Sequence, residues 1–227
     1  MSEFKLLDRS AGSTILLIPG WATDYRIFNP MDIKANYLVP VRFSPLDFEK
    51  NLFDEMDKND LDKVSIMGWS MGGFMAFDLA KKHPPRFDSV TLVSVRERYE
   101  GGEIKETMSY LKKNKTAFLY KFYNDCFSKN ERDELSRFKK ELMKDYLNTM
   151  SLDTLLDGLE YLSGSRITPP GPNGMKVRFV HGEEDRIAPV EEARSLSEKF
   201  PGSKFIPIET AGHIPFLKND FDKILND

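Results

Sequence analysis

The sequence predicts an α/β fold, in which a mostly parallel β-sheet carries helices on both faces and a helical cap is inserted into the chain. Short β-rich runs alternate with stretches of helical periodicity, the pattern of parallel strands joined by helices. Several of these runs are apolar throughout, as expected of strands that are buried on both faces. The alternation stops between about residues 96 and 172, where no strand is predicted and only helical periodicity remains.

The predicted strands share β-branched or aromatic residues and are bounded by turn-forming residues. In chain order they cover residues 14–18, 37–41, 64–67, 89–95, 176–180 and 204–208, with residues 4–7 as an edge strand. Helices are predicted between them over residues 48–58, 71–82 and 190–200, and a short one over residues 216–225 closes the chain. Right-handed crossovers would place all carboxyl ends of the strands on one edge, where functional loops are expected.

The interruption has the character of an inserted cap made of helices. Helical segments are expected near residues 105–113, 116–127, 131–149 and 151–162. The stretch Pro169-Pro170-Gly171-Pro172-Asn173-Gly174 contains turn-forming residues that return the chain to the sheet. We therefore expect a core made of residues 1–95 and 174–227, and a cap made of residues 96–173.

Composition excludes several classes of protein. The 227 residues are 40% hydrophobic and 30% charged, close to globular averages, so disordered and fibrous classes are excluded. A net charge of −3 gives no reason to expect nucleic acid as a partner. No apolar run approaches the roughly 20 residues of a membrane span, and residues 1–5 lack a signal-peptide core. The single cysteine, Cys126, forms no internal disulfide. A cytoplasmic enzyme without membrane attachment is expected.

The most informative motif is Gly68-Trp69-Ser70-Met71-Gly72, which follows a predicted strand and precedes a predicted helix. Small neighbours allow a serine to project from a sharp strand-to-helix turn, as in a nucleophile elbow. Ser70 would then stand at the N-terminal end of a helix, where the backbone N–H of Met71 is free to bind an oxyanion. The alternative is a tight turn with an incidental serine.

A nucleophilic serine needs a base, and the chain has three histidines. His213 lies in Ala211-Gly212-His213-Ile214-Pro215, after the last predicted strand and therefore at the functional edge of the sheet. His83 falls at the end of the helix that follows the elbow, where it is expected to act only as a helix C-terminal cation. His181 follows another strand and is expected to orient the neighbouring acidic loop. We expect His213 to be the base.

The base in turn needs a carboxylate that holds its tautomer. Glu183, Glu184 and Asp185 all follow the strand at residues 176–180. Asp185 is preferred because Arg186-Ile187-Ala188-Pro189 then forms a rigid turn into the next helix, whereas the two glutamates are expected to be solvated. The resulting chain order is Ser70, Asp185, His213.

With these motifs the chain resembles the α/β-hydrolases over nearly its whole length, because that family has the same order of serine, acid and histidine. Its first strand leads into Leu17-Ile18-Pro19-Gly20-Trp21, which resembles the family's His-Gly loop. The resemblance implies that the N–H of Trp21 is the second oxyanion donor. Pro19 replaces the usual histidine, and the same residues also fit a simple turn.

Within the superfamily, Gly-Trp-Ala after the first strand and Gly-Trp-Ser-Met-Gly-Gly at the elbow are similar to pimeloyl-acyl-carrier-protein methyl ester esterases of biotin synthesis. This resemblance implies that Trp21 and Trp69 flank the serine and shape an apolar substrate-binding channel; packing of Trp69 against the elbow helix is the alternative. It also implies a small-molecule or carrier-bound ester as substrate. No cofactor and no metal ion are expected.

Charge along the cap adds an independent hint about a partner. Residues 105–144 contain 11 Lys or Arg and 6 Asp or Glu, which leaves +5 in a chain of net charge −3. A basic cap would attract an acidic acyl carrier protein by complementary potential. The alternative is a set of ordinary solvated helix faces.

We therefore expect ester hydrolysis through an acyl-enzyme, with Ser70, Asp185 and His213 as catalytic residues and Trp21 and Met71 as oxyanion donors. Other functions remain possible interpretations of the sequence. These are a general short-chain carboxylesterase or thioesterase, a menaquinone-pathway type carbon–carbon lyase, and a non-catalytic protein that kept the fold.

Overall fold

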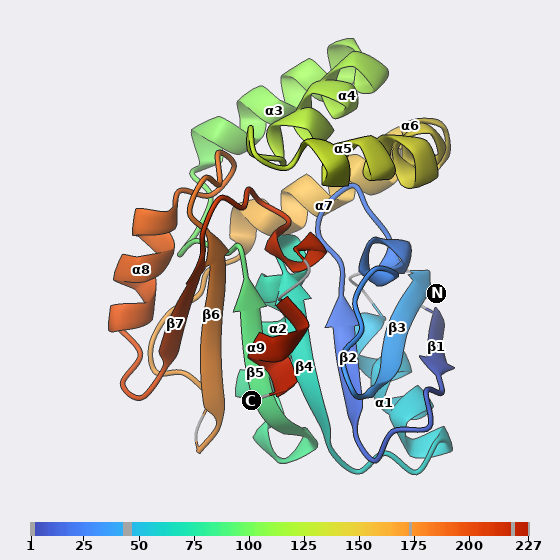
Figure 1. Ribbon diagram of the computed structural model, residues 1–227, viewed down its shortest axis with the longest axis vertical. Helices are drawn as coiled ribbons and strands as arrows, with labels where there is room; N and C mark the ends of the chain where they lie inside the picture. Colours follow the sequence, from blue (N-terminus) through green and yellow to red (C-terminus); the bar gives the residue numbers. More distant parts are fainter. Residues whose placement is uncertain (1–2, 43–46, 173, 219–220, 227) are drawn as a thin grey trace.

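In the described residues, 3–42, 47–172, 174–218 and 221–226 of the computed structural model, seven strands form one sheet (Figure 1). The strand order is β1-β3-β2-β4-β5-β6-β7. Strand β1 pairs with β3 in the antiparallel direction, and the other pairings are parallel. The strands are β1 (Glu3–Leu7), β2 (Thr14–Ile18), β3 (Asn36–Arg42), β4 (Val64–Trp69), β5 (Phe87–Val93), β6 (Lys176–Gly182) and β7 (Lys204–Ile208).

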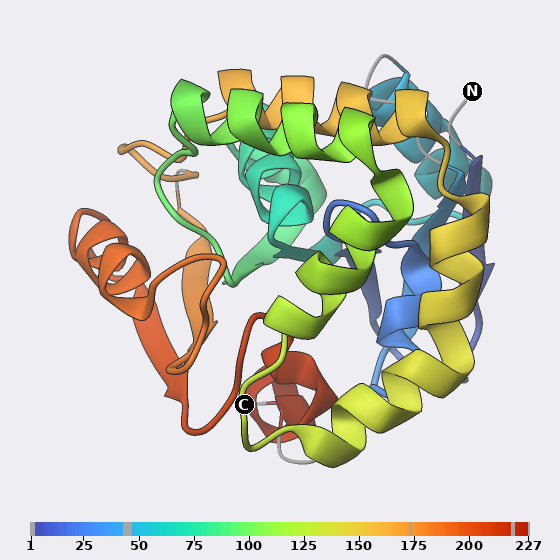
Figure 2. The same cartoon turned by 90° about the horizontal axis from the view of Figure 1, so that it is seen from above.

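Helices cover both faces of this sheet, as the sequence predicts. Helices α1 (Phe48–Lys58) and α2 (Met71–Lys82) lie on one face, and α9 (Phe221–Asn226) lies on the other (Figure 2). Helix α8 (Val190–Glu198) packs against β6 and β7. Each helix buries the stripe that its sequence makes apolar, which in α1 consists of Phe48, Leu52 and Met56 at spacings of four residues. The α/β fold class is confirmed.

A group of helices lies above the carboxyl ends of the strands (Figure 1). Its members are α3 (Gly101–Lys113), α4 (Lys115–Asp125), α5 (Arg132–Phe138), α6 (Lys144–Thr149) and α7 (Leu152–Gly164). A π-helical turn, Lys139–Met143, joins α5 to α6, so the single helix predicted for residues 131–149 has an irregular middle. The helical insertion is confirmed; the division at residues 95/96 and 173/174 stays a prediction.

Several predicted boundaries differ from those in the structure. Strand β5 ends at Val93 and not at residue 95, because Ser94 has a φ of 51° that turns the chain out of the strand. The closing helix predicted for residues 216–225 is a 3₁₀ turn, Pro215–Leu217, followed by α9, and positions 219 and 220 lie outside the described residues. Further 3₁₀ turns at Tyr25–Phe28 and Pro84–Arg86 were not predicted. No helix in the described part of the chain is both long and apolar enough to span a bilayer.

Candidate active site

Ser70 occupies the sharp turn between β4 and α2. Its φ of 53° and ψ of −117° lie in a region that residues with side chains rarely adopt, and such strain is concentrated at functional sites. The turn leaves no space for side chains at the flanking glycines. A Cβ on Gly68 would lie 2.1 Å from the carbonyl oxygen of Gly72, and one on Gly72 would lie 2.2 Å from that of Ile18. The close approach of strand and helix therefore explains both glycines.

His213 lies between Ser70 and Asp185 and contacts both. Its Nε2 is 2.9 Å from the Ser70 hydroxyl oxygen, and its Nδ1 is 2.7 Å from Asp185 Oδ2. An ionised carboxylate only accepts hydrogen bonds, so Nδ1 carries the proton and Nε2 of the neutral ring accepts from the serine. All three residues are buried, with His213 fully so. The structure thus brings together the three residues that the sequence placed in this order.

The loop after β6 fixes the Asp185 carboxylate from several sides. Oδ1 accepts the backbone N–H groups of Ile187 and Ala188, at 2.8 and 2.9 Å. Burial by itself raises the pKa of this carboxyl group. The positive charge available on His213 and the hydrogen bonds from His181 and His213 outweigh burial, so the net pKa lies well below its usual range. Asp185 therefore stays ionised beside the imidazole.

The two other histidines have other partners. His181 Nε2 donates to the carbonyl of Ala188 at 2.7 Å and lies 3.2 Å from Asp185 Oδ2, so this side chain holds the acid loop in shape. His83, at the end of α2, lies 2.8 Å from Glu49. Of the other two acids in the loop, Glu183 is exposed, and Glu184 accepts a hydrogen bond from Asn130 of the cap at 2.7 Å.

The backbone N–H groups of Trp21 and Met71, near Ser70, have no hydrogen-bond partner among the described residues. Met71 is the first residue of α2, so its N–H points out of the helix end. Trp21 is the third residue after the end of β2. The loop that contains it packs against the elbow, because the carbonyl groups of Ile18 and Pro19 lie next to Gly72. Free N–H groups of this kind are what an oxyanion requires.

The sequence profile of the α/β-hydrolase fold family matches residues 42–220 of this chain. The chain belongs to the α/β-hydrolase fold family. This agrees with the order of strands and with the elbow, acid loop and histidine loop at the carboxyl edge of the sheet.

Members of this family with related sequences include pimeloyl-acyl-carrier-protein methyl ester esterases. The protein of that name from Legionella pneumophila (strain Lens) is 23% identical over 92% of this chain and 90% of its own length. The one from Nitrosomonas europaea is 23% identical over 96% of this chain and 95% of its own length. These are distant relatives that span nearly the whole molecule.

Solved structures of esterases superpose on nearly the whole chain. An esterase from Exiguobacterium antarcticum has a TM-score of 0.81 at 17% identity and covers 99% of this chain and 94% of its own. A thermophilic esterase from Thermogutta terrifontis has a TM-score of 0.83 at 17% identity and covers 99% and 91%. At this level of identity the likeness establishes the fold.

A cavity of about 280 Å³ lies between this α/β-hydrolase core and the helices above it, and Ser70 forms part of its wall. Apolar side chains contribute most of the exposed lining. The lining residues are Trp21, Ser70, Arg96, Tyr99, Glu103, Ile104, Thr107, Phe118, Lys121, Phe122, Asp125, Leu159, Leu162, Arg186 and Ile187. Four of them, Glu103, Thr107, Phe118 and Lys121, also line a groove between α3 and α4, which gives the cavity a route to solvent.

The two tryptophans near the serine have different positions. Trp21 lines the cavity, and its indole N–H donates to the carbonyl of Leu155 in α7 at 2.8 Å. Trp69 is buried on the other side of the elbow, where its N–H donates to the carbonyl of His213 at 2.7 Å and its ring packs against Phe216. Trp69 is not among the residues that line the cavity. Its position agrees with the alternative of core packing, and a role of Trp69 in shaping the channel stays a prediction.

Sequence reasoning missed two residues that the structure brings to the site. Tyr99, in the loop after β5, lies beside the Ser70 hydroxyl in the cavity wall. Desolvation and the charge of Asp185 raise its pKa, so its phenol stays protonated and can donate. Glu131, at the start of α5, accepts the N–H of Gly212 next to His213 at 2.8 Å. The described residues contain no cluster of three or more His, Cys, Asp or Glu that could hold a metal ion.

Proposed function

We propose that this protein is a serine carboxylic-ester hydrolase that works through an acyl-enzyme. The continuous hydrogen-bonded line from Ser70 through His213 to Asp185 carries this proposal, because it supplies a nucleophile, a base and an orienting carboxylate at the wall of one cavity. The free N–H groups of Trp21 and Met71 and the esterase names of related proteins support it.

In the first half-reaction, Ser70 Oγ attacks the ester carbonyl while His213 Nε2 takes the hydroxyl proton. Asp185 stabilises the imidazolium that forms, and the Trp21 and Met71 N–H groups bind the negative oxygen of the tetrahedral intermediate. His213 then gives its proton to the departing alcohol as the carbon–oxygen bond breaks. An acyl group remains on Ser70.

In the second half-reaction, water attacks the acyl-enzyme. His213 takes a proton from that water, and the same two N–H groups hold the second oxyanion. Breaking the bond to Ser70 Oγ releases the carboxylic acid and returns the proton to the serine. No cofactor or metal ion takes part in these steps.

We further propose that the substrate is a methyl ester of a carrier-bound pimeloyl group. Two observations support it: distant relatives covering nearly the whole chain carry that activity in their names, and the lining of the cavity is mainly apolar, as a methylene chain requires. In this reaction the methyl ester carbonyl reaches Ser70, and methanol leaves.

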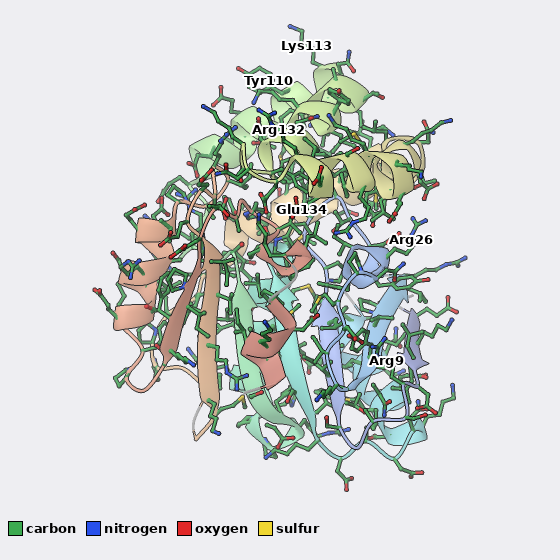
Figure 3. The ribbon with its side chains drawn as sticks, viewed as in Figure 1. Arg9, Arg26, Tyr110, Lys113, Arg132 and Glu134 are labelled. Carbon is green, nitrogen blue, oxygen red and sulfur yellow. The ribbon has the colours of Figure 1, made fainter. Side chains whose placement is uncertain are left out.

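The basic cap supports a carrier protein as partner. Its net charge of +5 between residues 105 and 144 complements an acidic carrier. Figure 3 shows Lys113 and Tyr110 at the outer end of α3, far from the sheet. This is the outer surface of the cap, and the groove between α3 and α4 includes both residues and shares part of its lining with the cavity. A carrier bound here could pass its acyl arm along the groove.

A hydrolysis panel tests these proposals together. Methyl-pimeloyl carrier protein, a short p-nitrophenyl ester and a matched thioester are assayed with the wild type and with Ser70→Ala. We expect the wild type to cleave the carrier-bound methyl ester best, and Ser70→Ala to lose about 10³-fold or more on every substrate. Near-normal rates for Ser70→Ala would refute the serine mechanism. Equal or better activity on the free ester would replace the carrier-bound substrate with a general carboxylesterase.

A further inference from the structure

Glu131 is a buried acid of the cap that the mechanism above does not use. Its side chain is 1% exposed. Oε2 accepts two backbone N–H groups, that of Ser128 at 2.7 Å and that of Gly212 at 2.8 Å. Oε1 has no hydrogen-bond partner in the described structure. A buried carboxyl oxygen without a partner costs stability, so its presence needs an explanation.

One of those two N–H groups belongs to the residue that precedes His213. The N–H of His213 itself donates to the carbonyl of Cys126, at 2.7 Å. Ser128 Oγ donates to the carbonyl of Thr210 at 2.6 Å. Three hydrogen bonds therefore join residues 126–131 of the cap to residues 210–213 of the histidine loop. Of these three, only the bond from the Gly212 N–H to Glu131 has an ionisable acceptor.

The cap and the histidine loop are closely packed at this junction. A Cβ added to Gly212 would lie 2.5 Å from the carbonyl oxygen of Cys126, 2.8 Å from the nitrogen of Ser128 and 2.9 Å from Glu131 Oε2. The peptide groups of Gly212 and His213 thus lie directly against the cap backbone. On its other side, the carbonyl of His213 accepts the indole N–H of Trp69 from the core.

We propose that Glu131 is a positioning residue for His213. The carboxylate fixes the peptide that leads into the histidine, and through it the distance between Nε2 and the Ser70 hydroxyl. This inference rests on the proposed function, in which His213 is the base. Small displacements of a base are enough to lower turnover strongly, because proton transfer requires close contact between the reacting groups.

These hydrogen bonds tie one end of the cap to the core. Residues 126–131 cannot move away from the histidine loop without releasing the N–H groups of Gly212 and His213.

Three variants test the proposal on a p-nitrophenyl ester. Glu131→Ala removes the acceptor, and we expect kcat to fall about 10- to 100-fold while KM changes less than about 3-fold. Glu131→Gln keeps an oxygen that can accept both N–H groups, so kcat should stay within about 3-fold of the wild type. Ser128→Ala is the matched control, because it removes a bond of the same junction that does not reach Gly212 or His213, and its kcat should also stay within about 3-fold.

Amide hydrogen exchange gives a readout that is independent of catalysis. The amides of Gly212 and His213 should exchange slowly in the wild type and in Glu131→Gln, and much faster in Glu131→Ala, while the amides of β4 stay protected in all variants. Unchanged protection and unchanged kcat in folded Glu131→Ala would overturn the proposal. If the wild type has no esterase activity, only the proposed function is refuted, because the exchange experiment still measures whether Glu131 holds the peptide that precedes His213.

Discussion

Two buried acids, Asp185 and Glu131, contact the histidine loop, and their pKa values shift in opposite directions. Asp185 and Glu131 each accept two backbone N–H groups through one oxygen. The second oxygen of Asp185 faces His213 and His181, whereas that of Glu131 faces no partner in the described residues. The pKa of Asp185 is lowered despite its burial, and burial raises the pKa of Glu131 against the effect of its two N–H donors.

The difference teaches that two backbone N–H donors lower the pKa of a buried acid by less than burial raises it. Burial disfavours the charged form of both groups. Only the imidazoles beside Asp185 reverse that effect, which suits a residue that must balance an imidazolium. In its proposed role, Glu131 needs only an oxygen that accepts the N–H of Gly212. The position of that oxygen therefore matters for the role, whereas its charge does not.

The largest effect that separates the two acids is expected from Asp185→Asn. The amide can no longer balance a protonated His213 and can present an N–H to the ring, so kcat should fall about 10³- to 10⁴-fold on a p-nitrophenyl ester. Folding should remain intact, as judged by circular dichroism. Glu131→Gln makes the same chemical change at the other acid and should cost little.

Glu184→Gln is the control for the choice of acid, because Glu184 lies in the same loop and its carboxylate accepts a hydrogen bond from Asn130 of the cap. Its backbone N–H donates to the carbonyl of Ala211, a bond that the substitution keeps. Its kcat should stay within about 2-fold of the wild type. If Glu184→Gln loses activity and Asp185→Asn keeps it, the assignment of the acid is wrong.

A smaller effect is expected in the pH dependence of stability, and it has opposite signs for the two acids. The pKa of Asp185 is lower in the folded state, so its stabilisation is present above the unfolded value of about 3.9 and is lost as pH falls through the folded value. The pKa of Glu131 is higher in the folded state, so its stabilisation is present below about 4.3 and is lost as pH rises through the folded value.

Urea unfolding of the wild type, Asp185→Asn and Glu131→Gln across acidic and neutral pH measures these signs. The advantage of the wild type over Asp185→Asn should shrink at low pH, and its stability relative to Glu131→Gln should decrease as pH rises. Parallel pH profiles for the three proteins would contradict the comparison.

Much of this architecture could be predicted from the sequence because its signals are local. The elbow is a run of five residues whose glycines are required by contacts of 2.1 and 2.2 Å, and the acid and histidine follow strands whose apolar runs are easily read. Parallel strands place those loops at one edge, so the meeting of Ser70, Asp185 and His213 followed from topology. The edge strand at residues 4–7 was also predicted, whereas its antiparallel direction was not.

What could not be predicted depends on how the cap packs. Glu131 lies in a charged, helix-forming stretch, and nothing local distinguishes it from Asp133 or Glu134; its burial arises only when the cap meets the histidine loop. Tyr99 follows β5 at the same functional edge, so the rule applied to the other loops would have found it. The sequence also could not show on which side of the elbow the ring of Trp69 lies, because contacts with Phe216 and His213 determine this side.

The central claim, that these three side chains make Ser70 a nucleophile for esters, is tested most directly by trapping the acyl-enzyme. The protein is mixed with excess p-nitrophenyl ester, quenched within the first turnovers, digested and mapped by mass spectrometry. The account predicts a burst of p-nitrophenol close to one per active site when deacylation is slower, and the acyl group on Ser70, absent in Ser70→Ala. Sustained hydrolysis with no acyl group on Ser70, or with the group on another residue, would contradict it.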